Sequence, residues 1–258
     1  MIKKLLIHAA LAGTALLFSA TPLLAGPTIY FGENQTPGQT VTGAPLAAKN
    51  AFLGQLTGVG TETFEGFNAG DTVPLPITFA GGAGNIVATL NGTGEVAKTI
   101  APSPGNPDPN AGRFNTTGAT AAPSDGKWWD VSGDFEIDFD VAISAFGFYG
   151  TDIGDFSGQV TVDLTDTSGV VHTFIINNKI GGNNASLLFW GFTDTGNSYT
   201  KIVFGNTNPG LGGDFFGFDD MIVGDKAQIV PPGSVPEPGP LALIGLGLVG
   251  LAASRRRR

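Results

Sequence analysis

The sequence contains no cysteine, and this absence removes several classes of site at once. Without cysteine the chain has no disulfide, no thiol nucleophile and no thiolate metal site. Histidine is nearly as scarce: the chain has only two histidines, His8 and His172. Metal sites built from several imidazoles are therefore excluded, and a Ser-His-Asp triad would depend on His172 alone, since His8 lies in the N-terminal leader described below.

Basic residues are also few outside the two ends of the chain. Six of the 13 Lys and Arg residues are Lys3, Lys4 and the four arginines Arg255, Arg256, Arg257 and Arg258. The rest of the chain holds seven basic residues against 22 acidic ones, a net charge of −15. Such a surface repels nucleic acid and anionic lipid head groups, so we expect no nucleic-acid partner. Bound cations and neutral glycans are compatible with it.

Long helical patterns are missing from the middle of the chain. The 40 glycines and 17 prolines separate short apolar runs, which favours many short strands. One helix is predicted over Pro45 to Leu56, with Gly54 and Gly58 weakening or ending it. A hydrophobic content of 41% and a charged content of 14% fit one globular domain, which we place at residues 26–227.

Strict alternation of apolar and polar residues predicts strands in this domain. Phe135, Ile137 and Phe139 alternate with acidic residues, and similar patterns recur near Val160 and Ile202. His172 belongs to another such pattern and is interpreted as a half-buried strand residue. We therefore predict an all-β fold, an antiparallel jelly-roll sandwich with one short N-terminal helix.

The first 25 residues have the form of a signal peptide. A basic start at Lys3 and Lys4 is followed by an apolar run from Leu5 to Phe18, and Ala25 is a small residue suited to cleavage. We expect a signal helix that signal peptidase removes after Ala25. A permanent anchor is the alternative, but the apolar run is shorter than a bilayer span.

The last residues combine three features in a fixed order. A Pro-rich linker at 228–240 contains Pro236, Glu237 and Pro238, and an apolar helix is predicted from Leu241 to Ala253, before the arginine cluster. This order resembles the PEP-CTERM sorting signal of Gram-negative bacteria that make exopolysaccharide. The resemblance implies that an exosortase cuts near Pro236-Glu237-Pro238, so that residues 241–258 anchor the chain only transiently in the inner membrane. A single-pass anchor with a Pro-rich stalk is the alternative, because the arginines orient the helix in either case.

The domain itself resembles lectin-like and carbohydrate-binding jelly rolls at three short pieces, Thr63 to Phe67, Phe146 to Asp152 and Phe216 to Val223. In such modules a Glu on an early strand and an Asp on the last strand share a structural calcium. The resemblance implies a calcium site at Glu65 and Asp219, with Asp220 as the other candidate. Ordinary hydrogen-bonded carboxylates at strand ends are the alternative, and no cofactor is otherwise required.

Glu136, Asp138 and Asp140 are the strongest candidates for catalytic residues. They resemble the Glu-Ile-Asp-x-Glu strand of retaining jelly-roll glucanases, whose alternate carboxylates lie on one face. Asp140 is one methylene shorter than the Glu of that motif, which argues against an acid/base of the required reach. A plain acidic solvent face is the alternative.

Trp128 and Trp129 are adjacent, so on a strand they would point to opposite sides. One of them is a candidate for stacking on a sugar, although core packing of both is the alternative.

Taken together, these features predict a non-enzymatic protein of the cell surface or extracellular matrix that binds polysaccharide. A glycoside hydrolase and a purely structural matrix component are the alternatives.

Overall fold

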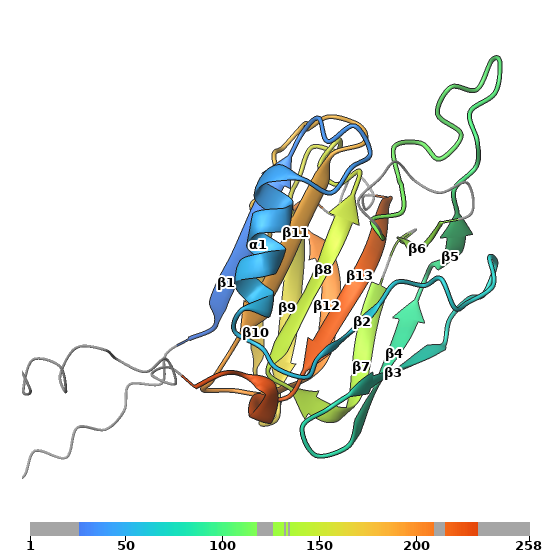
Figure 1. Cartoon of the computed structure of the whole chain (residues 1–258). Coiled ribbons are helices and arrows are strands. Elements are labelled where there is room, and N and C mark those ends of the chain that lie inside the picture. Colours follow the sequence, from blue (N-terminus) through green and yellow to red (C-terminus); the bar gives the residue numbers. More distant parts are fainter. Residues whose placement is uncertain (1–25, 118–125, 132, 134, 209–214, 232–258) are drawn as a thin grey trace, which may run out of the picture.

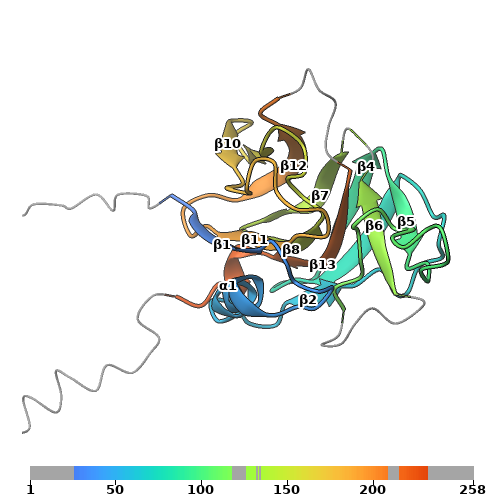
Figure 2. The same cartoon turned by 90° about the horizontal axis from the view of Figure 1, so that it is seen from above.

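The structure, a computed structural model, describes residues 26–117, 126–131, 133, 135–208 and 215–231. These residues form two antiparallel sheets that pack face to face, and one helix covers part of one sheet. Figure 2 shows the layers in turn: β12 and β7, then β11 and β8, then α1. The predicted all-β antiparallel sandwich is confirmed, whereas its jelly-roll connectivity stays a prediction.

The first sheet has seven strands, and in it β2 pairs only with β13. In spatial order its path is β1 (Thr28–Asn34), β11 (Leu187–Thr193), β8 (Ala145–Thr151), β13 (Phe216–Gly224), β6 (Lys127–Val131) and β5 (Glu95–Lys98), with β2 (Gly60–Glu62) beside β13.

The second sheet has six strands. In spatial order they are β10 (Val171–Ile175), β9 (Val160–Asp166), β12 (Tyr199–Asn206), β7 (Phe135–Ile143), β4 (Asn85–Gly92) and β3 (Leu75–Ala80). The predicted alternation is confirmed for Phe135, Ile137 and Phe139, which are buried while Asp140 is exposed, but it is wrong for Val141, which is 43% exposed. One face of this sheet is therefore core, and the other carries the polar side chains.

The only α-helix among the described residues is α1 (Gly43–Leu53), close to the predicted Pro45 to Leu56. It ends at Gly54, as its sequence predicted. Phe52 packs from α1 against Phe189 and Tyr30 on the outer face of the seven-stranded sheet. Gly147 on β8 allows this approach, since a Cβ there would lie 3.0 Å from the Phe52 ring and 2.9 Å from that of Phe189. Because α1 covers them, β8 and β11 are buried on both faces.

The packed region reaches Val230, three residues beyond the predicted domain end at 227. A 3-10 turn, η2 (Lys226–Gln228), is capped by Asp225. Ile229 then bridges to Leu56, and the Val230 N–H donates to Gln55 O over 2.8 Å. The two described ends leave the sandwich on the same side, away from β5 and the loop after it (Figure 1, Figure 2).

Candidate functional site

The outer face of the seven-stranded sheet carries two pockets, separated by a segment that lies between them, Pro109 to Thr117. The pocket on the α1 side has a volume of about 280 Å³, and the one on the β5 side about 290 Å³. The first is lined by Val41, Leu46, Lys49, Asn50, Thr116, Tyr149 and Asp220. The second is lined chiefly by Glu95, Lys98, Ile100, Asn110, Arg113, Trp128 and Asp130.

A β-bulge in β13 shapes the first pocket. Asp219 pairs with Tyr149 and Ile222 with Gly147, so β13 has one residue more than its partner over this stretch. Asp220 takes the extra position with φ of 49°, a left-handed conformation that costs strain in a residue other than glycine. Phe218 and Met221 point into the core on either side of the bulge. The two carboxylates between them therefore lie away from the core between the sheets.

Asp219 is completely buried, and its carboxylate is held by three donors. The Thr116 N–H, the Thr116 hydroxyl and the Asp220 N–H donate to it over 2.7, 2.8 and 2.7 Å. Burial raises the pKa of Asp219 well above its usual value, and the neighbouring charge of Asp220 raises it further. The segment containing Thr116 is thus fixed to β13 by a buried carboxyl group.

Glu65 holds the preceding residue of the same segment. Its carboxylate accepts the Asn115 side-chain amide over 2.6 Å and the Lys127 N–H over 3.0 Å. The prediction that Glu65 lies on an early strand is wrong: β2 ends at Glu62, and Phe64 with φ of 57° turns the chain before Glu65. Glu65 and Asp219 are therefore linked through Asn115 and Thr116, which are adjacent.

The calcium hypothesis stays a prediction. The Asp219 carboxylate already accepts a hydrogen bond from Thr116, and the Lys49 ammonium group donates to the Asp220 carboxylate over 2.5 Å. Within the described ranges no group of three or more His, Cys, Asp or Glu residues is arranged to hold a metal ion. In the first pocket the cation that neutralises Asp220 is therefore a lysine of this chain.

The second pocket contains a partly buried ion pair. Arg113 Nε lies 2.6 Å from Asp130 Oδ1. Burial raises the pKa of Asp130, while Arg113 and the indole N–H of Trp128 lower it and Glu95 raises it. Glu95 and Lys98 extend from β5 at the rim and are exposed. Donors and acceptors thus face the same small volume.

Both tryptophans are buried, because the segment Pro109 to Thr117 covers the outer side of β6. Trp129 packs in the core beside Phe64 and Phe135, and Trp128 lines the second pocket with 2% of its surface exposed. Neither indole face is open for a sugar ring to stack on. Trp128 contributes an edge of the pocket instead.

The acidic strand lies on the outer face of the six-stranded sheet. Lys201 on β12 lies 2.8 Å from Glu136 and 3.5 Å from Asp138, and Asp140 accepts the Val87 N–H over 2.6 Å. The hydrogen bond that Lys201 donates to Glu136 raises the pKa of Lys201. The three carboxylates share a face, as predicted, but each already has a partner on a neighbouring strand.

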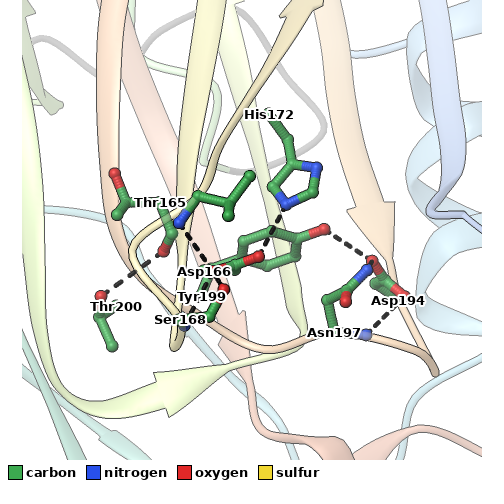
Figure 3. Close-up of polar contacts among 9 residues, drawn as sticks. Thr165, Asp166, Ser168, His172, Asp194, Asn197, Tyr199 and Thr200 are labelled. Atoms are coloured by element: carbon green, nitrogen blue, oxygen red, sulfur yellow. Dashed lines mark hydrogen bonds and ion pairs between the residues drawn. The ribbon is translucent and has the colours of Figure 1, made fainter.

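His172 lies on β10, as its sequence predicted, and belongs to a network at one end of the same sheet (Figure 3). Its Nε2 is 2.9 Å from Asp166 Oδ2, and Ser168 donates its hydroxyl to Asp166 Oδ1 over 2.6 Å. These hydrogen bonds lower the pKa of Asp166. The serine bonds the carboxylate and not the imidazole, which is the wrong order for a catalytic triad.

Asp152, at the end of β8, provides a pH-dependent contribution to stability. Burial raises its pKa to about 7, although the Ala185 N–H lowers it and Asp155 raises it. An unfolded Asp has a pKa of about 3.9, so between about pH 4 and pH 7 the native state holds a proton that the unfolded chain has released. The free energy of unfolding therefore falls as the pH rises through this window.

Asp152→Asn should accordingly raise the melting temperature at pH 8, and the gain should shrink to nothing near pH 4. Asparagine keeps the acceptor for Ala185 and tolerates φ of 66°. Equal gains for Asp152→Asn at pH 4 and pH 8 would contradict the assignment.

Sequence reasoning did not identify Lys49, Arg113 and Thr116. A lysine in a helix and an arginine or a threonine in an irregular segment carry no local signal of their partners. Only the fold brings them to Asp220, Asp130 and Asp219, which lie on later strands, β13 and β6. The tail residues Pro236, Glu237, Pro238, Arg255, Arg256, Arg257 and Arg258, like the signal peptide and both terminal helices, lie outside the described residues.

Comparison with protein families finds one match, to the PEP-CTERM protein-sorting motif, over residues 234–258. No curated protein and no solved structure matches the chain. The matched tail marks an exported protein with a C-terminal sorting signal that an exosortase processes. Over the described ranges, no helix is long and apolar enough to span a bilayer. The match covers none of the sandwich.

Proposed function

We propose that the sandwich is a non-enzymatic polysaccharide-binding module, delivered by exosortase processing to the cell surface or extracellular matrix, and that the pocket beside β5 and β6 binds the sugar. The observation that carries this proposal is the set of groups around that pocket: Arg113 and Lys98 as donors, and Glu95 and Asp130 as acceptors. A neutral sugar presents hydroxyl groups that donate and accept at once, so it uses both kinds of group.

The position of the pocket supports this proposal. The described chain leaves the sandwich on the side away from β5, so the β5 side, where the pocket lies, is clear of the end that leads to the sorting motif (Figure 1). The apolar part of the lining includes Ile100, which suits the carbon face of a sugar. The volume of about 290 Å³ is close to the roughly 300 Å³ at the lower end for ligand pockets and accepts a single sugar unit of a chain.

The proposal is tested by binding of the purified full chain to exopolysaccharide from the producing cells and to a soluble β-glucan. Glu95→Gln combined with Lys98→Met should weaken binding about tenfold, because the first change replaces a charged acceptor by a weaker neutral one, the second removes a donor, and hydrogen bonds are worth roughly 0.5–1.5 kcal/mol each. Both side chains are exposed, so the fold should be unaffected. Unchanged affinity would mean that this pocket is not the site.

The matched control is Glu136→Gln combined with Lys201→Met, the same pair of changes on the other sheet. It should leave affinity unchanged, and the unmodified chain should release no reducing sugar. If the unsubstituted chain released sugar and the control variant did not, the protein would be a glycoside hydrolase and not a binding module. Failure of the unmodified chain to bind either polysaccharide would favour a structural matrix component.

A further inference from the structure

Lys49 and Asp220 meet in the pocket beside α1, although 170 residues separate them in the chain. Lys49 Nζ lies 2.5 Å from Asp220 Oδ2, closer than the roughly 2.7–2.9 Å of an ordinary charged hydrogen bond. The two side chains are 15% and 8% exposed. The contact joins the only α-helix of the described chain to its last strand.

The surroundings hold both groups in one arrangement. The Thr117 hydroxyl donates to Asp220 Oδ1 over 3.1 Å, on the oxygen opposite Lys49. The Lys49 ammonium group lies 4.7 Å from the centroid of the buried Tyr149 ring. The Tyr149 hydroxyl has no hydrogen-bond partner among the described residues. The buried carboxyl group of Asp219 lies beside Asp220 and bonds its N–H.

We propose that Lys49 and Asp220 condense into an intramolecular isopeptide bond, which cross-links α1 to β13 covalently. The reaction needs no cofactor and no oxidant. A proton first passes from the ammonium group to the carboxylate, which gives an amine and a carboxylic acid. Nζ then attacks Cγ and forms a tetrahedral intermediate, whose Oδ1 accepts the Thr117 hydroxyl. A second proton leaves Nζ for Oδ2, and the C–Oδ2 bond breaks to release water.

The balance of this reaction is one ammonium and one carboxylate converted into one amide and one water. Two buried charges disappear with it. In free solution the condensation is unfavourable, but a fixed contact acts like an effective concentration of up to about 10⁵–10⁸ M. Asp219 lies next to Asp220, and its buried carboxyl group accepts the Asp220 N–H over 2.7 Å, which helps to fix the backbone that carries the acyl group. A hydroxyl donor, a nucleophile and an acyl group thus stand within one cluster.

The bond would stabilise an exported protein that contains no cysteine. A secreted domain of this kind has no disulfide to hold its first and last elements together. An amide between α1 and β13 would supply that connection next to the end from which the sorting tail begins. The proposal is independent of sugar binding at the other pocket.

Mass spectrometry of the folded full chain tests the proposal after incubation at neutral pH. The protein without substitutions should have a mass below the value calculated from its sequence by one water, about 18 Da. Proteolysis should yield a branched peptide joining Lys49 to Asp220. Lys49→Arg retains the ion pair but lacks the amine, so it should show the full mass. Thr117→Val should form the bond more slowly. The full mass in folded, unmodified protein overturns the proposal and leaves an ordinary buried ion pair.

Discussion

Phe218→Ala should lower the free energy of unfolding by about 3–5 kcal/mol, the range expected for truncating a fully buried aromatic side chain. Phe218 is fully buried on β13, and its ring lies 4.8 Å from that of Phe148 and 5.4 Å from that of Phe135. Its other ring contacts are Phe64, Phe146 and Phe204. Removing it leaves a cavity between rings from both sheets, which rigid strands cannot close.

Phe215→Ala is the matched control for this prediction. Phe215 directly precedes β13, but its side chain is 54% exposed, so its loss should change stability by no more than about 0.5 kcal/mol. Urea unfolding followed by tryptophan fluorescence measures both variants. Similar losses for the two would show that the aromatic cluster is not the centre of the core.

Gly32→Ala should also be strongly destabilising, by about 1–3 kcal/mol or more. Gly32 lies on β1 where the first turn of α1 crosses it. A Cβ there would lie 3.0 Å from the Pro45 nitrogen and much closer to the Ala44 carbonyl group. These are backbone atoms, so no side-chain rotation relieves the clash, and α1 must move off the sheet. The loss of stability reports how tightly the helix is fixed.

Gly60→Ala gives the control for the same added methyl group. Gly60 lies on β2, and a Cβ there would meet no atom within 4 Å. Its melting temperature should match that of the unmodified chain or exceed it slightly, because alanine loses less backbone entropy on folding. If Gly32→Ala were as stable as Gly60→Ala, the packing of α1 on β1 would be looser than the structure indicates.

Local patterns accounted for the elements but not for their burial. The alternation around Ile137 predicted a strand with one core face, and Gly54 predicted the end of α1, because each depends on neighbours in the chain. The same logic placed Trp128 and Trp129 on opposite sides of β6, which is correct. It did not predict that the outer side would be covered as well.

The carboxylate sites show a similar division. Glu65 and Asp219 were singled out from short motifs, and the fold does connect them, through Asn115 and Thr116. The partners were not foreseeable, since an irregular segment gives no periodic signal. The bulge directs the carboxylates of both Asp219 and Asp220 away from the core. It depends on the pairing of β13 with β8, which the sequence of β13 alone does not determine.

By itself the sequence determined the export and sorting of this protein, because such signals are short, contiguous and recognised as linear segments. It also determined the helix and the alternating strands β7, β9, β10 and β12, since their periodicity is local. Only the tertiary structure decided which faces are covered and which charges meet, Lys49 with Asp220 and Arg113 with Asp130. A strand pattern states which side chains share a face, whereas the element that packs on that face comes from a distant part of the chain.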